Sequence, residues 1–333
     1  MTAYMDHKDL ANEIIDEQRA RQISDGVHRV LDQIAQAESA SGREPGSVRL
    51  LAATKTRDVG EIMAAIDAGI RLIGENRPQE VTAKAAGLRR LCAQRGFTIG
   101  VGGTGDDHSD GAVGDPGQSG NTGNASATQH VTAAAGSTTA PAATVPVATA
   151  AASAAAAAAT TAAGAAAAGP ATHIPFHLIG QLQSNKIGKV LPVVDTIESV
   201  DSIELAERIS RRAVMHGITV GVLLEVNESG EASKSGCEPS HAIDLARRIG
   251  AMGGLELQGL MTIGAHVDDE RTIRAGFAHL RRTRDQILAL DEPGLAHCTQ
   301  LSMGMTHDLT FAIEEGSTLV RVGTAIFGER AFI

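Results

Sequence analysis

Residues 48–55 read Val-Arg-Leu-Leu-Ala-Ala-Thr-Lys, an apolar run that ends in a lysine. The run is typical of a β-strand, and Asp58 shortly after it is a residue that often begins a helix. Lys55 therefore lies where a strand passes into a loop. In a barrel of alternating strands and helices, that end of the strands carries the chemistry. A lysine held there can lose its proton and attack a carbonyl carbon, whereas an ordinary solvated lysine is the alternative interpretation.

Further strand-like runs follow the first, and they alternate with helical patterns. The predicted strands are residues 48–54, 71–74, 176–180, 196–200, 219–227, 256–263, 298–303 and 318–323. Helical patterns cover residues 9–40, 59–68, 202–216, 240–252 and 270–290. Eight alternations with short connections favour an α/β fold of one domain, a (β/α)8 TIM-type barrel with an N-terminal helix.

A low-complexity segment, residues 98–172, interrupts the alternation. It contains no Lys, Arg or Glu and consists mainly of Ala, Gly, Thr and Ser. Such a segment has too little large apolar surface to offset the entropy of ordering, so we expect a long disordered Ala/Gly/Thr-rich insertion. The domain division is then residues 1–97 for the N-terminal helix and first part of the barrel, 98–172 for the insertion, and 173–333 for the remainder of the same barrel. About 260 residues remain without the insertion, which is close to the usual size of this barrel.

Charge and cysteine content exclude several classes of protein. A formal net charge of −10 argues against binding to nucleic acid or to an anionic membrane surface. Three widely spaced cysteines without a Cys-x-x-Cys pair argue against a disulfide framework or a zinc site, and we expect no metal. Residues 1–10 lack the apolar core of a secretion signal. We therefore expect a cytoplasmic protein.

Polar and glycine residues gather at one end of several predicted strands. Ser302 lies in the seventh strand, and Gly323 and Thr324 end the eighth. The loops after these two strands often bind phosphate in such barrels, because glycine permits close approach and backbone N–H groups and hydroxyls donate to phosphate oxygens. A phosphate site together with a reactive lysine suggests pyridoxal phosphate held as a Schiff base.

These motifs resemble those of a known family, the pyridoxal phosphate homeostasis proteins. The matching segments include Ala-Thr-Lys-Thr at 53–56, Gly-Glu-Asn at 74–76, His-Leu-Ile-Gly-Gln-Leu-Gln-Ser-Asn-Lys at 177–186, Ile-Glu-Ser-Val-Asp-Ser at 197–202, Val-Asn-Glu-Ser-Gly-Glu at 226–231, Gly-Leu-Met-Thr-Ile-Gly at 259–264, Leu-Ser-Met-Gly-Met at 301–305 and Arg-Val-Gly-Thr-Ala-Ile-Phe-Gly at 321–328. The family consists of single-domain barrels similar to the N-terminal domain of alanine racemase. The resemblance covers nearly everything from residue 48 to 328 except the insertion.

The resemblance implies roles for individual residues. Lys55 matches the lysine that forms the Schiff base with pyridoxal 5'-phosphate, and Arg321 matches the arginine that faces the pyridine nitrogen. A guanidinium cannot accept a proton, so it favours an unprotonated ring, which is a weaker electron sink. The other expected cofactor-binding residues are Ser302, Gly323 and Thr324 at the phosphate and Asn76 in the pocket lining. Pro78, which follows Arg77, departs from the family pattern without touching these motifs.

The family further implies a protein that binds pyridoxal phosphate, buffers it and delivers it to apo-enzymes within vitamin B6 homeostasis. We expect a monomer without catalytic turnover, with no nucleic-acid or membrane partner. The alternative is a pyridoxal phosphate-dependent amino-acid racemase, which needs a base on each face of the substrate carbon. In alanine racemase the second base is a tyrosine, whereas the one tyrosine here is Tyr4, near the N-terminus.

Overall fold

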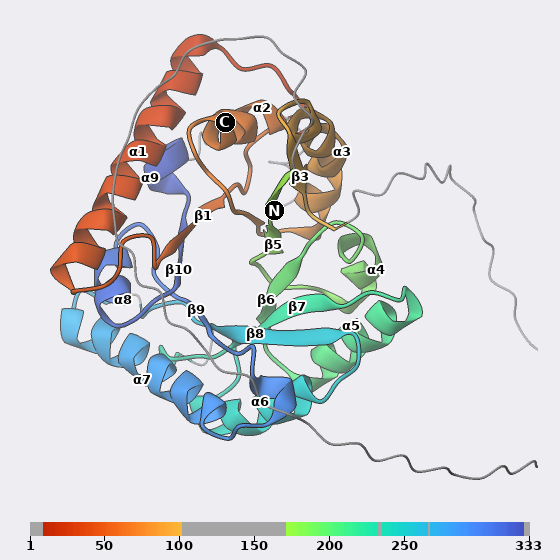
Figure 1. The fold of residues 1–333 in the computed structure, drawn as a ribbon, viewed down its shortest axis with the longest axis vertical. Helices are drawn as coiled ribbons and strands as arrows, with labels where there is room; N and C mark the ends of the chain where they lie inside the picture. The colour runs from red at the N-terminus through yellow and green to blue at the C-terminus, as the bar shows by residue number, and fades with distance from the viewer. Residues whose placement is uncertain (1–8, 102–170, 232–234, 266, 330–333) are drawn as a thin grey trace, which may run out of the picture. The chain divides into compact units, whose positions relative to one another are not determined.

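The barrel prediction is confirmed in the computed structural model, which describes residues 9–101, 171–231, 235–265 and 267–329. Among these residues, eight strands form a closed barrel in the order β1-β10-β9-β8-β7-β6-β5-β2, and every neighbouring pair is parallel (Figure 1). The strands are β1 (Arg49–Ala53), β2 (Ile73–Glu75), β5 (Phe176–Leu178), β6 (Thr196–Val200), β7 (Val220–Glu225), β8 (Leu255–Met261), β9 (Gln300–Ser302) and β10 (Leu319–Val322). Each lies within one residue of a predicted strand or inside it.

Helices surround the strands on the outside (Figure 1). In the described part of the chain they are α1 (Glu17–Ala40), α2 (Val59–Asp67), α3 (Pro78–Gln94), α4 (Ile187–Val190), α5 (Ile203–Met215), α6 (Ala242–Gly250), α7 (Glu270–Leu288), α8 (Leu309–Glu314) and α9 (Thr324–Phe327), with 3-10 turns η1 (Ser184–Lys186), η2 (Pro239–His241) and η3 (Pro293–Leu295). Asp16 begins α1 by accepting a hydrogen bond from the Arg19 N–H. The apolar residues of α1 recur at helical spacing and are buried where the helix packs against α2, α8 and α9.

Two features of the fold go beyond the sequence prediction. Pro78 is the first residue of α3, a position where the absent N–H costs nothing. The expected insertion, residues 98–172, contains strand residues at both ends, because β3 (Phe97–Ile99) pairs in parallel with β4 (Thr172–Ile174). Residues 102–170, which separate these two strands in the sequence, lie outside the described part of the chain.

The interior of the barrel is filled by the residues that alternate along each strand. Leu51 and Ala53 of β1 meet Leu72 and Leu319 there, and Ile179 packs against them. A second and larger apolar cluster fills the space between the strands and the helices. The same alternation turns Arg321 toward the barrel axis, because it lies two residues beyond Leu319 in β10. Lys55 lies two residues beyond the end of β1, in the turn that follows it.

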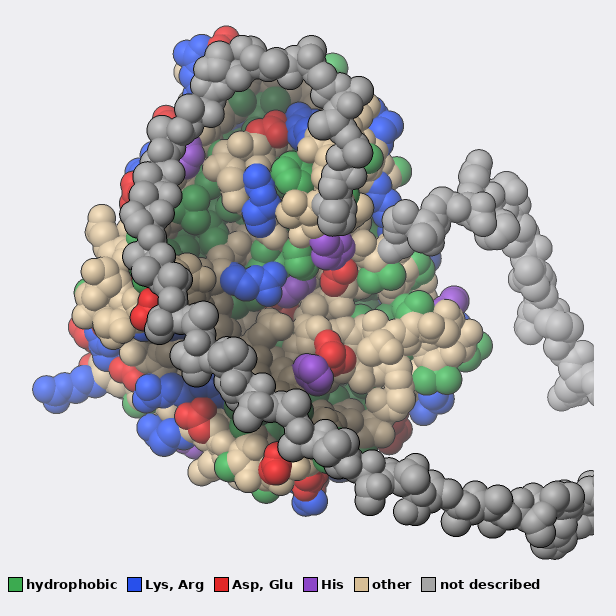
Figure 2. Space-filling model, in the orientation of Figure 1, with side chains coloured by type: hydrophobic (Ala, Val, Ile, Leu, Met, Phe, Trp, Pro, Cys, Tyr) green, Lys and Arg blue, Asp and Glu red, His purple; other side chains and the backbone are tan. Residues whose placement is uncertain are grey.

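Two surface properties bear on possible partners: the hydropathy of the helices and the distribution of charged side chains. In the described residues no helix is both long enough and apolar enough to cross a bilayer. Acidic and basic side chains lie side by side on the face shown in Figure 2. Figure 2 therefore gives no sign of a basic surface for nucleic acid on that face.

The contact between α1 and α9 is tight enough to test by adding a single methyl group. A Cβ at Gly26 would overlap the carbonyl oxygen of Ile326, whereas a Cβ at Gly188 in α4 would meet nothing within 4 Å. We expect Gly26→Ala to lower the free energy of unfolding by about 1–3 kcal/mol through overpacking. Gly188→Ala is the control and is expected to leave stability unchanged or slightly raised. Urea unfolding measures both, and equal midpoints for the two variants would contradict the packing.

Candidate functional site

Closure of the barrel brings the predicted lysine beside the predicted phosphate loop. Ala52 pairs with Val322 of β10, so the residues that follow β1 lie next to Gly323. The approach is close, since a Cβ at Gly323 would lie 3.1 Å from the Ala53 carbonyl oxygen. Lys55 is half-buried, and Thr324 is exposed at the mouth of the barrel. Residues far apart in the sequence therefore meet at the carboxyl ends of the strands, where this fold holds its ligands.

Asn76 lies on the other side of the lysine, at the end of β2. It is half-buried, and a Cβ at Gly180 would overlap its carbonyl oxygen, so the ends of β2 and β5 approach closely. The structure thus gathers Lys55, Asn76, Gly323 and Thr324 around one end of the barrel.

The turn that carries Lys55 is unusual. The N–H of Arg57 donates to the carbonyl of Thr54 (3.0 Å), which closes a tight turn around the lysine. Within it, Thr56 adopts a φ of 63°, in the left-handed region that β-branched residues avoid. Its N–H donates to Oε2 of Glu80 at 2.7 Å. Strained backbone next to a functional side chain persists only where the surroundings hold it.

A buried ion-pair cluster lies directly beneath this turn. Lys84 of α3 is fully buried, and its ammonium contacts Glu75 Oε1 at 2.5 Å and Glu80 Oε2 at 3.3 Å. The same ammonium donates to the carbonyl oxygen of Thr54 at 3.0 Å. The Thr54 hydroxyl also donates to Glu75 Oε1, at 2.5 Å. The sequence interpretation did not single out Lys84 or Glu80, although their spacing of four residues in a helix indicates an ion pair.

The two carboxyl groups of this cluster titrate differently. Burial raises the pKa of Glu75 to about 8, against the opposing charge of Lys84. Burial also disfavours the charge of Glu80, but hydrogen bonds from Glu75 and from the Thr56 N–H, together with Lys84, hold its pKa below the ordinary value. One ammonium balances one carboxylate, so the cluster is neutral while Glu75 keeps its proton.

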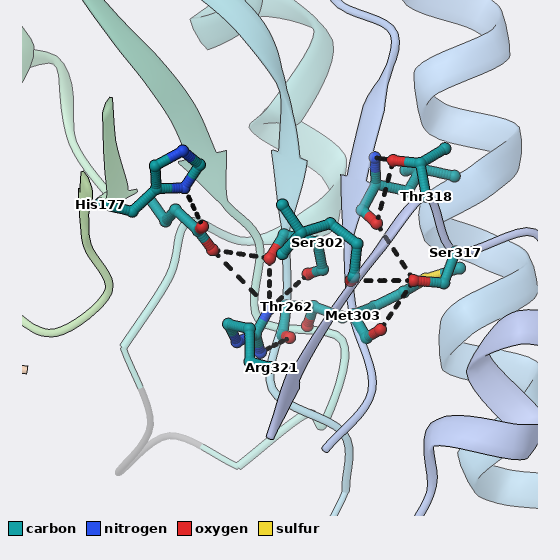
Figure 3. A network of polar contacts seen from close by, with 10 residues as sticks. His177, Thr262, Ser302, Met303, Ser317, Thr318 and Arg321 are labelled. Atoms are coloured by element: carbon teal, nitrogen blue, oxygen red, sulfur yellow. Dashed lines mark hydrogen bonds and ion pairs between the residues drawn. The ribbon is translucent and has the colours of Figure 1, made fainter. Parts of the chain in front are cut away.

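A second polar network fills the barrel around Arg321 (Figure 3). Arg321 is 5% exposed, and its Nη1 donates to the Ser302 carbonyl (2.7 Å) and hydroxyl (2.6 Å). Its Nη2 donates to the carbonyl of Thr262 at 2.7 Å. Burial lowers the pKa of Arg321, and the nearby carboxylates Glu198 and Glu225 oppose that shift. Five donors on a planar guanidinium suit this arrangement, which fixes the side chain in one position.

Glu198 of β6 supplies the counter-charge in this network. Its Oε2 accepts from the Ser302 hydroxyl at 2.6 Å, and its Oε1 lies 2.6 Å from Nδ1 of His177 (Figure 3). Burial would raise the pKa of Glu198, but the contacts with His177, Arg321 and Ser302 outweigh it and lower the pKa. His177 also lines a cavity of about 440 Å³ with Arg49 and Gln300, which belong to the opposite ends of the strands. The structure therefore gives His177 a place in the barrel interior.

The structure places the Ser302 side chain inside the barrel. Ser302 is fully buried, and its hydroxyl donates to Glu198 and accepts from Arg321. Its expected place at a phosphate stays a prediction, and the sequence pattern could not show these two contacts.

Glu225 is a further buried carboxyl that sequence reasoning missed. It is the last residue of β7 and is 4% exposed. Burial and the nearby charge of Asp201, opposed by the charge of Arg321, raise the pKa of Glu225 to about 7. The alternation along β7 turns Glu225 inward, toward the same end of the barrel as Lys55. In the sequence, the one indication that Glu225 belongs near the site is its position at the end of a predicted strand.

Comparison with known proteins places this barrel in a class. Residues 124–331, more than half of the chain, match the family model of the alanine racemase N-terminal domain. The relative from Vibrio cholerae, a pyridoxal phosphate homeostasis protein, is 32% identical over 94% of this chain and 98% of its own length. A relative of the same name from Aquifex aeolicus is 40% identical over 48% of this chain and 68% of its own length. The chain belongs to the pyridoxal phosphate homeostasis protein family.

Solved structures agree with this assignment. An unknown protein from Bifidobacterium adolescentis is 61% identical, with a TM-score of 0.75 over 96% of this chain and all of that chain. PipY of Synechococcus elongatus, solved with pyridoxal phosphate bound, is 26% identical, with a TM-score of 0.56 over 89% of this chain and all of its own. Alanine racemase of Clostridium difficile, at 11% identity and a TM-score of 0.55, shares the fold.

The protonated state of Glu75 makes stability depend on pH. Because the folded pKa of about 8 lies above the ordinary value of 4.5, the folded protein retains a proton that the unfolded chain releases between these values. Stability from this group is complete below about pH 4.5 and falls as pH rises toward 8. The expected slope is on the order of 1 kcal/mol per pH unit.

Glu75→Gln removes the titrating group and keeps the size of the side chain. We expect the free energy of unfolding of this variant to lack that slope, so that it gains stability relative to the natural protein as the pH rises. Urea unfolding across the pH range measures the difference, with exposed Glu204→Gln as the control. Parallel curves for Glu75→Gln and the natural protein would show that Glu75 is ionised when folded.

Proposed function

We propose that this protein binds pyridoxal 5'-phosphate as a Schiff base on Lys55 and takes part in its homeostasis in the cytoplasm, by holding the cofactor and delivering it to apo-enzymes. The observation that carries the proposal is the meeting of Lys55, Gly323-Thr324 and the buried Arg321 at one end of the barrel. The names of the curated relatives and the cofactor-bound PipY structure support it.

The residues present fit such a cofactor at three points. Half-buried Lys55 offers a primary amine beside the mouth of the barrel, and its neutral form would hold the cofactor through the aldehyde carbon, with release of water. Gly323 has no Cβ, which allows β10 to approach Ala53 of β1 closely. The N–H groups of Gly323 and Thr324 and the Thr324 hydroxyl would hold the phosphate.

Arg321 supports holding rather than turnover. When bound, pyridoxal phosphate supplies an electron-withdrawing pyridine ring, which is strongest when its nitrogen is protonated. Arg321 is held by Ser302 and Thr262 in a network that includes Glu198, and it has no proton-accepting atom to offer the ring. An unprotonated ring stabilises carbanions weakly, so the protein acts as a carrier without catalytic turnover.

The proposal has a direct chemical test. Borohydride reduction of the protein loaded with pyridoxal phosphate, followed by peptide mapping, is expected to place the pyridoxyl group on Lys55. Lys55→Ala is expected to lose the label and the visible absorbance, whereas the control Lys189→Ala, an exposed residue of α4, keeps both. A label on another lysine in the natural protein would overturn the assignment.

An activity assay distinguishes the racemase alternative from the proposed carrier. A racemase needs bases on both faces of the substrate carbon, and Tyr4, the tyrosine of this chain, lies outside the described residues. We expect the loaded protein to restore activity to an apo-enzyme while free cofactor is scavenged, and to racemise no common amino acid. Robust racemisation that disappears in Lys55→Ala would establish the alternative.

A further inference from the structure

The two peptide units that flank the Cα of Lys55 are both tied to one buried cluster. The carbonyl of Thr54, in the unit before Lys55, accepts from Lys84 Nζ at 3.0 Å. The N–H of Thr56, in the unit after it, donates to Glu80 Oε2 at 2.7 Å. Lys84 and Glu80 contact each other at 3.3 Å, so the chain of contacts closes around Lys55. Rotation about the backbone of Lys55 must break one of these contacts.

The cluster lies where such contacts are strong. The side chains of Lys84, Glu75 and Glu80 are at most 1% exposed, so water competes little for their hydrogen bonds. Lys84 balances the charge of Glu80, while burial favours the protonated, neutral form of Glu75. Removing the ammonium leaves the buried Glu80 carboxylate without its counter-charge. It also removes one of two donors to the Thr54 carbonyl, which keeps the hydrogen bond from the Arg57 N–H.

The cluster holds Thr56 in a left-handed backbone conformation. A φ of 63° is strained for a β-branched residue, so Thr56 would relax if the Glu80 contact were lost. Relaxation at Thr56 would turn the preceding peptide unit and move the Lys55 side chain with it. A displacement of about 1 Å at a reacting group can lower a rate about a hundredfold.

We propose that Lys84 and Glu80 are positioning residues that hold the Lys55 turn in the conformation that captures the cofactor aldehyde. This inference rests on the proposed function. Neither residue touches the cofactor in this account, since both lie under the turn and act through the Thr54 carbonyl and the Thr56 N–H. Their contribution is the fixed direction of the Lys55 amine.

Lys84→Met is the first variant, because methionine fills a similar volume without a charge. The control is Lys189→Met, in which the lysine is exposed on α4. Two rates are measured on folded protein well below its unfolding temperature. One is the rate of pyridoxal phosphate capture at Lys55, followed by absorbance and by borohydride labelling. The other is acetylation of Lys55 by a small anhydride, followed by mass spectrometry.

We expect Lys84→Met to lower the capture rate by about tenfold or more, while acetylation stays within about twofold of the natural protein. A small reagent approaches the amine from many directions, whereas the cofactor, fixed at its phosphate and ring, requires one. An equal fall in both rates would mean that the cluster controls access or nucleophilicity, and it would overturn the positioning role. Unchanged capture in a folded Lys84→Met would overturn it as well.

Glu80→Gln is the second variant, and it keeps the inference testable if Lys84→Met does not fold. The amide keeps the size of the side chain but weakens the contacts with Lys84 and the Thr56 N–H. We expect the same selective fall in capture. Adding Thr56→Gly to either variant is expected to restore part of the rate, because glycine adopts a positive φ without cost. A folded Glu80→Gln with natural capture, or no recovery with Thr56→Gly, would contradict the proposal.

The outcomes separate this inference from the proposed function. If the natural protein is not labelled at Lys55, the proposed function fails whatever the variants do, and the inference fails with it because no capture exists to be positioned. If the natural protein is labelled and the folded variants capture equally fast, the inference fails alone. Labelling of the natural protein with a selective loss in both variants supports the two together.

Discussion

The pairing of β1 with β10 is the constraint on which the arrangement of the site depends. The pairing of Ala52 with Val322 joins the first and last strands of the barrel, which lie far apart in the sequence. It brings Lys55 beside Gly323. Without closure the lysine and the phosphate loop would belong to opposite edges of an open sheet. A shift of one residue in the pairing of β1 with β10 would turn their inward-facing side chains outward. The register of this pair therefore determines which residues lie beside Lys55.

Closure also forces polar groups into the barrel, where each must find a partner. Arg321 is satisfied by Ser302 and Thr262, and Glu198 lies against His177. Lys84 is satisfied in the same way outside the barrel axis, between two glutamates and the Thr54 carbonyl. Buried networks of this kind are costly when one member is missing, so they fix positions more than they add stability. In the described residues, one such network surrounds Arg321 inside the barrel, and the other surrounds Lys84 beneath the Lys55 turn.

Much of the fold could be predicted from the sequence, because strand and helix periods alternate clearly and the strand ends carry recognisable residues. Backbone position alone predicts that Lys55, Asn76, Gly323 and Thr324 lie at one end of the barrel, and the strand pairing places them there. The sequence pattern does not give the direction of a side chain, so it could not show that the Ser302 hydroxyl contacts Glu198. Lys84 was missed because a lysine in a helix normally lies in solvent, whereas here it is buried among Glu75, Glu80 and the Thr54 carbonyl. The pairing of β3 with β4 was missed for a similar reason, since three-residue strands at the edges of a low-complexity segment carry little signal.

A crystal structure of the protein grown with pyridoxal phosphate tests the central claim most directly. The account predicts continuous density from Nζ of Lys55 to the cofactor, with the ring nitrogen toward Arg321 and the phosphate against Gly323 and Thr324. In the same map, Lys84 and Glu80 are predicted to keep their contacts with Thr54 and Thr56. A cofactor bound at another lysine, or at the opposite ends of the strands, would contradict the account.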